Sequence, residues 1–135
     1  MGSELAVELK LLGAAVAVGL VQLLWAAAAA RAHQGDLKWA AGPRDTPMPL
    51  GGVAARLERA FWNFAETFSF FAAAVLACAV AGKLGGPLTV WGAGLYVGGR
   101  ALYAPLYASG IPTVRTLVWL VSMVGLVMVL VALFR

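Results

Sequence analysis

Apolar residues fill four long runs of the chain, and polar residues concentrate between these runs. Residues 11–30 and 116–134 contain no charged side chain, while the runs 60–82 and 85–109 contain one each, Glu66 and Arg100. Each run is close to the roughly 20 residues with which an α-helix crosses about 30 Å of hydrocarbon. The pattern predicts four membrane-spanning helices, at about residues 5–31, 57–82, 86–109 and 112–134, in a single domain covering residues 1–135.

Helix-breaking residues fall between the four runs. Prolines 43, 47 and 49 follow the first run, the sequence Gly85-Gly86-Pro87 follows the second, and Gly110 with Pro112 follows the third. Backbone polar groups in lipid must be satisfied within each segment, and no alternating strand of about ten residues appears. An all-α fold is expected. The first run could instead be a signal peptide, but the acidic Glu8 ahead of it and its length argue against that interpretation.

Composition excludes several other classes of protein. Hydrophobic residues make up 62% of the chain and charged residues 12%, whereas a soluble domain carries roughly 25% charge. One cysteine and one histidine predict neither an internal disulfide nor a metal site. The net charge of +4 comes from scattered basic residues, so nucleic acid is not an expected partner.

The distribution of basic residues predicts the orientation in the membrane. With four helices, the first and third connections share one side with the residues Arg31, Lys38, Arg44, Arg56, Arg59 and Arg115. The opposite side holds Lys10, Lys83 and Arg135. Because cytoplasmic loops are enriched in Lys and Arg, we expect these two connections in the cytoplasm. The protein is then a multi-pass protein of the inner or cell membrane with both termini outside.

Two polar stripes enter the membrane from that same side. On the second helix, Arg56, Arg59, Asn63 and Glu66 follow a spacing that places them on one face. On the third helix, Arg100, Tyr103 and Tyr107 also share a face. Glu66 and Tyr103 should lie at similar depth, roughly 9–10 Å inside their helix ends, so the two stripes are predicted to converge on one region.

These stripes also have a purely structural interpretation. The arginines near helix ends could be anchors at the membrane surface, and the two tyrosines could belong to an aromatic belt. A structural ion pair between Arg59 and Glu66 would account for the carboxylate of Glu66 inside the second apolar run. Trp25, Trp39, Trp91 and Trp119 are interpreted as packing or interface residues, whereas Trp62 flanks the polar stripe and could line a pocket.

The polar stripe of the second helix resembles a known family signature. The run 56–66 reads Arg-x-x-Arg-Ala-x-x-Asn-x-x-Glu, and the third helix ends in Arg-x-x-Tyr-x-x-x-Tyr. Both motifs resemble those of the MAPEG family, the membrane-associated proteins in eicosanoid and glutathione metabolism. The resemblance covers the whole chain and implies a homotrimeric four-helix bundle with glutathione bound between neighbouring protomers.

The resemblance also implies roles for individual residues. Glutathione would be bound from the second and third helices by Arg59, Asn63, Glu66, Arg100, Tyr103 and Tyr107. Arg31 resembles a basic residue that family members place near the glutathione carboxylates. Arg115 resembles the arginine that activates the sulfur, although its alignment needs a one-residue shift. The sequence departs from the cysteinyl-leukotriene synthase at Phe61, which replaces a glutamine, and at Thr67, which replaces a tyrosine.

The function implied is that of a glutathione S-transferase or peroxidase acting on lipophilic electrophiles. Glutathione would be the co-substrate, the lipid bilayer and a lipophilic substrate the other partners, and no metal is expected. Two alternatives remain open. One is a non-catalytic lipid-binding or scaffold protein of the same fold, and the other is a small proton-coupled exporter that uses Glu66.

Overall fold

The computed structural model describes residues 5–135, which form helices joined by connecting segments. In chain order the helices are α1 (Val7–Gln34), α2 (Leu37–Ala41), α3 (Gly52–Val80), α4 (Pro87–Ala108) and α5 (Pro112–Leu133). No strand occurs in this part of the chain. The all-α prediction is confirmed, and the short helix α2 is an addition within the first connection.

Helix α3 begins earlier than the polarity pattern predicts. It starts at Gly52, whereas the pattern places the start near residue 57. The added turn contains Arg56, whose Nε donates a hydrogen bond of 3.0 Å to the carbonyl oxygen of Ala108 at the end of α4. The last carbonyls of a helix have no partner within the helix. Arg56 therefore ties the beginning of α3 to the end of α4.

Three helices, α1, α3 and α5, are long and apolar enough to cross a membrane by length and composition. Large apolar side chains such as Leu24 on α1 and Val127 on α5 are exposed on the outside of the protomer. An outward apolar surface of this kind is typical of contact with lipid or with other subunits. These findings indicate a membrane protein. Helix α4 is not among the three, since its glycines, tyrosines and Arg100 lower its mean hydropathy.

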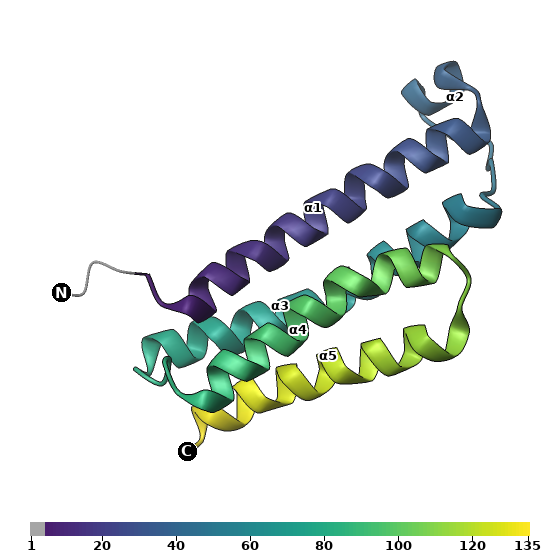
Figure 1. Ribbon diagram of the computed structural model, residues 1–135. Helices are drawn as coiled ribbons and strands as arrows, with labels where there is room; N and C mark the ends of the chain where they lie inside the picture. Colours follow the sequence, from purple (N-terminus) through teal and green to yellow (C-terminus); the bar gives the residue numbers. More distant parts are fainter. Residues whose placement is uncertain (1–4) are drawn as a thin grey trace.

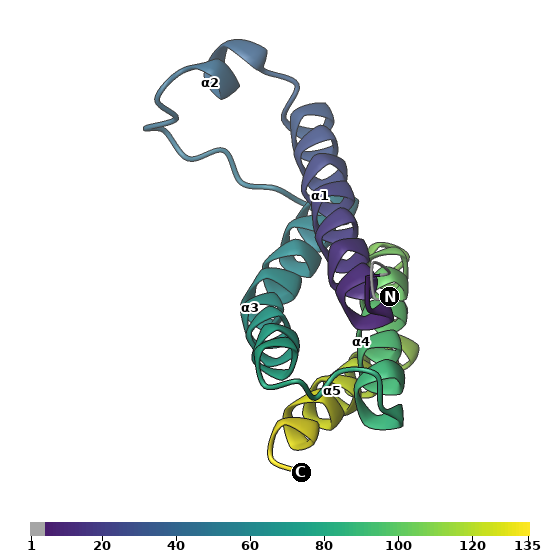
Figure 2. The ribbon, with the colours of Figure 1, turned by 90° about the vertical axis from the view of Figure 1, so that its left-hand side faces the viewer.

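The four long helices lie alongside one another with the connections at two opposite ends (Figure 1). Helix α4 has 22 residues, as many as α5, and runs beside it along most of its length. The α3–α4 turn and the carboxyl end of the chain lie at one end, and the α4–α5 turn lies at the other. Figure 2 shows the connection that contains α2 extending beyond this second end, away from the long helices.

Small residues allow α4 and α5 to approach closely. A Cβ added to Gly99 would lie 2.9 Å from the Cβ of Ser122, and one added to Gly92 would lie 3.0 Å from the Cβ of Met128. Such contacts are tighter than side chains tolerate, so the two backbones meet directly, as small residues permit between membrane helices.

A buried carboxylate stabilises the end of the molecule that contains the α3–α4 turn. Glu8, in the first turn of α1, is 1% exposed. It accepts hydrogen bonds from the backbone N–H of Gly85 and from the hydroxyl of Thr89, at the start of α4. A buried carboxylate persists only where such donors replace water. The acidic residue ahead of the first apolar run thus connects α1 to the α3–α4 turn.

Replacing Glu8 by alanine should lower the free energy of unfolding by about 1–3 kcal/mol, because the N–H of Gly85 and the hydroxyl of Thr89 lose their acceptor. Chemical denaturation in mixed detergent micelles would measure the change. Lys10→Ala is the matched control, since Lys10 lies two residues away and is exposed. Equal stability of the Glu8 variant and the wild-type protein would contradict the structural role of Glu8.

Candidate functional site

Polar side chains from three helices line a hollow of about 220 Å³ at the end of the molecule nearest α2. The lining residues are Arg59 and Asn63 on α3, Tyr103 and Tyr107 on α4, and Arg115, Thr116 and Trp119 on α5. Each helix contributes a pair spaced four residues apart, which places the pair on one face and about 6 Å apart along the axis. The hollow therefore has an outer layer of Arg59, Tyr107 and Arg115, and an inner layer of Asn63, Tyr103 and Trp119.

The outer layer is cationic, and both of its arginines contact Tyr107. Nε of Arg59 donates a hydrogen bond of 3.0 Å to the hydroxyl oxygen of Tyr107. The guanidinium carbons of Arg59 and Arg115 lie 5.7 and 4.3 Å from the centre of the Tyr107 ring. Guanidinium groups at such distances are attracted to the ring face. Tyr107 thus holds two positive charges at one site, and no acidic residue of the described chain lines this hollow.

The inner layer is uncharged and offers free hydrogen-bonding atoms. Within residues 5–135, Oδ1 of Asn63 and Nε1 of Trp119 are both buried and have no hydrogen-bond partner. Buried polar atoms are nearly always paired, because an unpaired one loses its bonds to water without replacement. One acceptor and one donor of this layer therefore have no partner among the described residues of the protomer. The outer layer suits an anion, and the inner layer suits a neutral polar group.

Arg100 lies behind this site and does not line it. Its side chain is fully buried, and none of its three guanidinium nitrogens has a hydrogen-bond partner among the described residues. The guanidinium carbon lies 4.2 Å from the centre of the Tyr103 ring and 5.8 Å from that of Phe64. Tyr103 therefore separates Arg100 from the hollow, and Arg100 contributes positive potential to the site without direct access to it.

Glu66 is placed apart from the converging polar residues. Its side chain is exposed on α3 and does not line the hollow that contains Asn63 and Tyr103. The spacing brings Arg59 and Asn63 to the α4 tyrosines, but Glu66 lies beyond them along the helix and faces outward. Within the described residues no bond between Arg59 and Glu66 is formed, and Nε of Arg59 donates to the hydroxyl of Tyr107.

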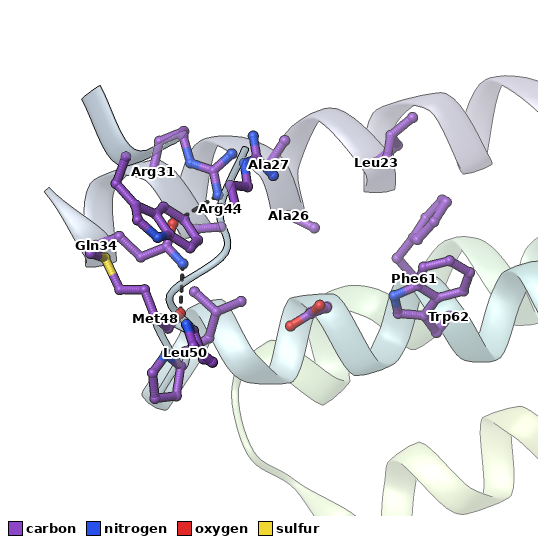
Figure 3. A pocket seen from close by; sticks show the side chains of 15 residues that line it. Leu23, Ala26, Ala27, Arg31, Gln34, Arg44, Met48, Leu50, Phe61 and Trp62 are labelled. Atoms are coloured by element: carbon purple, nitrogen blue, oxygen red, sulfur yellow. Dashed lines mark hydrogen bonds between the residues drawn. The ribbon is translucent and has the colours of Figure 1, made fainter. Parts of the chain in front are cut away.

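Arg31 lines a separate crevice of about 520 Å³ between α1, α3 and the first connection (Figure 3). Its NH2 group donates a hydrogen bond of 2.8 Å to Oε1 of Gln34, whose amide in turn donates to the carbonyl of Met48. Arg31 and Arg44 lie at the loop end of the crevice, while Phe61 and Trp62 lie farther along α3. A single protomer thus does not bring Arg31 to the hollow of Arg59 and Arg115.

The two departures from the family signature have different structural consequences. The hydroxyl oxygen of Thr67 lies 3.0 Å from that of Tyr96 and also donates to the carbonyl of Phe64. Tyr96 is fully buried and stacks on Phe71 with ring centres 4.0 Å apart. Thr67 therefore supports the core of the protomer and does not reach the hollow, whereas Phe61 presents an aromatic ring to the crevice of Figure 3.

Sequence reasoning missed two residues of the hollow, Thr116 and Trp119. The sequence alone indicates a packing or interface residue at Trp119, because tryptophans are common at membrane interfaces. Its spacing of four residues from Arg115 is the signal that could have identified it, since residues so spaced share one face of a helix. Trp62, which the sequence places beside the polar stripe as a residue that could line a pocket, lines the crevice that contains Arg31. In the described part of the chain, no three His, Cys, Asp or Glu side chains gather in a way that could hold a metal ion.

Apolar helices of membrane-spanning length around a hollow lined by two arginines define a helical membrane protein. The family model described as MAPEG family matches residues 10–135, and the chain belongs to this family, which includes glutathione transferases and related proteins. The family prediction from the polar motifs is thus confirmed. Neither the search of curated proteins nor the search of solved structures gave a match.

Proposed function

We propose that the protein is a glutathione-dependent transferase or peroxidase that acts on lipophilic electrophiles in the membrane. The observation that carries the proposal is the pairing of Arg59 and Arg115 around Tyr107, in a hollow lined by no acidic residue of the described chain. Membership of a family that includes glutathione transferases supports it.

Glutathione matches the charges of this hollow. It carries two carboxylates, which guanidinium groups bind in a bidentate manner, and Arg59 is the residue best placed to bind one of them. A free thiol has a pKa of about 8.5, so about 3% of it is ionised at neutral pH. Arg115 beside the sulfur lowers the pKa of the glutathione thiol by stabilising the thiolate. The thiolate then attacks the electrophile, and the protein needs no nucleophile of its own.

A homotrimer would complete the site. Arg31 and the exposed Glu66 lie outside the hollow of their own protomer, so they can contribute to glutathione binding only across a subunit interface. Glu66 would pair with the ammonium group of glutathione, and Arg31 with a carboxylate. This arrangement would also cover a carboxylate that is otherwise costly within a membrane span.

In the membrane, α4 would be the fourth spanning helix. Its length equals that of α5, and the positions of the connections at two opposite ends support an even number of crossings. The protein would lie in the inner or cell membrane. The distribution of basic residues would then place the α2 connection and the α4–α5 turn in the cytoplasm. Glutathione would then enter the hollow from the cytoplasm.

Isothermal titration of glutathione into the purified protein tests this function. Arg59→Ala should weaken binding about ten- to a hundredfold, because a hydrogen bond to a charged group contributes about 1.5–3 kcal/mol. Arg135→Ala is the matched control, since Arg135 is an exposed arginine at the carboxyl end that lines neither the hollow nor the crevice of Arg31, and it should leave the affinity within about twofold. Unchanged affinity of the Arg59 variant would contradict the proposed site.

A second candidate function is non-catalytic binding of lipid. The observation that favours it is the crevice of about 520 Å³, whose α3 wall carries the aromatic rings of Phe61 and Trp62. Ultraviolet absorbance of the thiolate distinguishes the two functions. Saturating glutathione at neutral pH should produce the thiolate signal if the protein is a transferase, whereas binding of a radiolabelled fatty acid without any thiolate signal would favour the scaffold.

A further inference from the structure

The indole N–H of Trp119 is a hydrogen-bond donor in the inner layer of the hollow. The proposed binding of glutathione does not use it. Trp119 lies one helical turn beyond Arg115 on the same face of α5, and both residues line the hollow. Its side chain packs against a cluster that contains Ala60 and Tyr103, so the indole has a fixed position. Its Nε1 is nevertheless buried without an acceptor among the described residues.

Packing alone does not explain an indole at this position. Buried tryptophans usually place their N–H on a partner, and a phenylalanine would fill the space without an unpaired donor. The free acceptor of the same layer, Oδ1 of Asn63, also lacks a partner, so Trp119 and Asn63 do not satisfy each other. The indole N–H thus has no acceptor among the described residues of the protomer.

The two layers separate the two substrates by their chemistry. Arg115, in the outer layer, is the residue proposed to stabilise the glutathione thiolate. A lipophilic, uncharged substrate is better matched to the uncharged inner layer than to the cationic outer layer. Its reacting group therefore meets the sulfur between Arg115 and Trp119, which are about 6 Å apart along the helix axis.

We propose that Trp119 donates a hydrogen bond to an oxygen of the electrophile, and that the enzyme thereby favours α,β-unsaturated carbonyl compounds. This inference rests on the proposed glutathione-dependent function and names its substrate class. A donor aimed at an oxygen on which negative charge develops stabilises the transition state more than the ground state. Trp119 is then a catalytic residue that selects substrates bearing a carbonyl oxygen.

The addition of glutathione to the α,β-unsaturated carbonyl compound needs no oxidant or reductant. The thiolate sulfur forms a bond to the β-carbon, and the electron pair of the carbon–carbon double bond moves toward the carbonyl, which becomes an enolate. The charge on the enolate oxygen is stabilised by the N–H of Trp119. Water then delivers a proton to the α-carbon, which replaces the proton that glutathione released to solvent on forming the thiolate. The product is the saturated thioether.

Steady-state kinetics with two electrophiles tests the proposal in the full-length protein. The first electrophile, 4-phenylbut-3-en-2-one, carries a conjugated carbonyl, whereas the second, benzyl chloride, has no oxygen and loses chloride. Trp119→Phe keeps an aromatic ring but removes the N–H. We expect kcat/KM for the enone to fall at least about tenfold, toward the roughly hundredfold loss typical of a removed oxyanion donor, while kcat/KM for benzyl chloride stays within about twofold.

Further readouts separate this role from a structural one. Thiolate absorbance with saturating glutathione should be unchanged in Trp119→Phe, and Trp119→His, which restores a ring N–H, should recover part of the enone activity. Trp91→Phe is the control for loss of an indole, because Trp91 is an exposed residue of α4 outside the hollow.

Equal losses with both electrophiles, or no loss with either, would overturn the role of Trp119 while leaving the proposed function intact. A wild-type protein that forms thiolate and conjugates benzyl chloride but not the enone would also overturn it. Wild-type protein without thiolate or turnover would instead reject the proposed function, and the role of Trp119 with it.

Discussion

Replacing Arg115 by alanine should reduce glutathione-dependent turnover at neutral pH about 25-fold, because the thiolate fraction falls from about 76% to about 3% when the thiol pKa rises by two to about 8.5, while glutathione affinity stays within a few fold. The guanidinium of Arg115 is stacked on Tyr107 at 4.3 Å, which fixes its charge in the outer layer. Stabilising a thiolate enough to lower the thiol pKa by two requires about 2.7 kcal/mol, and this contribution disappears with the side chain. Arg59 remains to bind a carboxylate, so binding should persist. Turnover, thiolate absorbance and calorimetric affinity measure the three quantities separately.

The matched control for this prediction is Arg115→Lys. Lysine retains a positive charge but not the planar guanidinium that stacks on the tyrosine ring, so it should recover only part of the thiolate signal. If the alanine variant kept the thiolate signal and turnover of the wild-type protein, the activating charge would have to come from another residue. If glutathione affinity and the thiolate signal of the alanine variant fell by the same factor, Arg115 would be a binding residue.

Replacing Gly125 by alanine should destabilise the protein by about 3 kcal/mol, at the upper end of what an overfilled core costs. A Cβ at this position would overlap the carbonyl oxygen of Gly92 and would lie 2.8 Å from the backbone nitrogen of Tyr96 and 2.9 Å from the Cβ of Leu95. Backbone atoms cannot move aside as a flexible side chain can, so α4 and α5 must separate. Thermal unfolding in lipid nanodiscs would measure the loss.

The control for Gly125 is a glycine of α4 that has open space around it. A Cβ added to Gly98 meets no atom within 4 Å, and alanine is a better helix former than glycine by up to about 1 kcal/mol. Gly98→Ala should therefore leave stability unchanged or raise it slightly. A loss of stability as large in Gly98→Ala as in Gly125→Ala would show that the close contact of α4 and α5 is not the cause.

Separating these two helices should also damage the candidate site. The hollow draws Tyr103 and Tyr107 from α4 and Arg115 and Trp119 from α5, so its shape depends on how the two helices are spaced. A temperature at which Gly125→Ala loses thiolate formation before it loses helical circular dichroism would connect the helix contact to the site.

Much of the site could be predicted because helical spacing is regular. Residues Arg59 and Asn63, and likewise Tyr103 and Tyr107, lie four apart, so each pair must share a helix face. The opposite directions of α3 and α4 then bring the two pairs to the same end of the molecule. The same argument fails for Glu66, because the direction in which a face points depends on the neighbouring helices, and α3 turns Glu66 outward.

The apolar runs alone thus determined an all-helical membrane protein, since the length of an apolar run is a local property. The two polar motifs resembled those of the MAPEG family, which the family model then confirmed. Only the tertiary structure decided that Trp119 joins the hollow, that Arg31 lines a different crevice, that Arg100 is sealed behind Tyr103 and that Glu8 is buried against the α3–α4 turn. Each of these depends on which faces of separate helices meet, and that choice is made by packing between residues far apart in the chain.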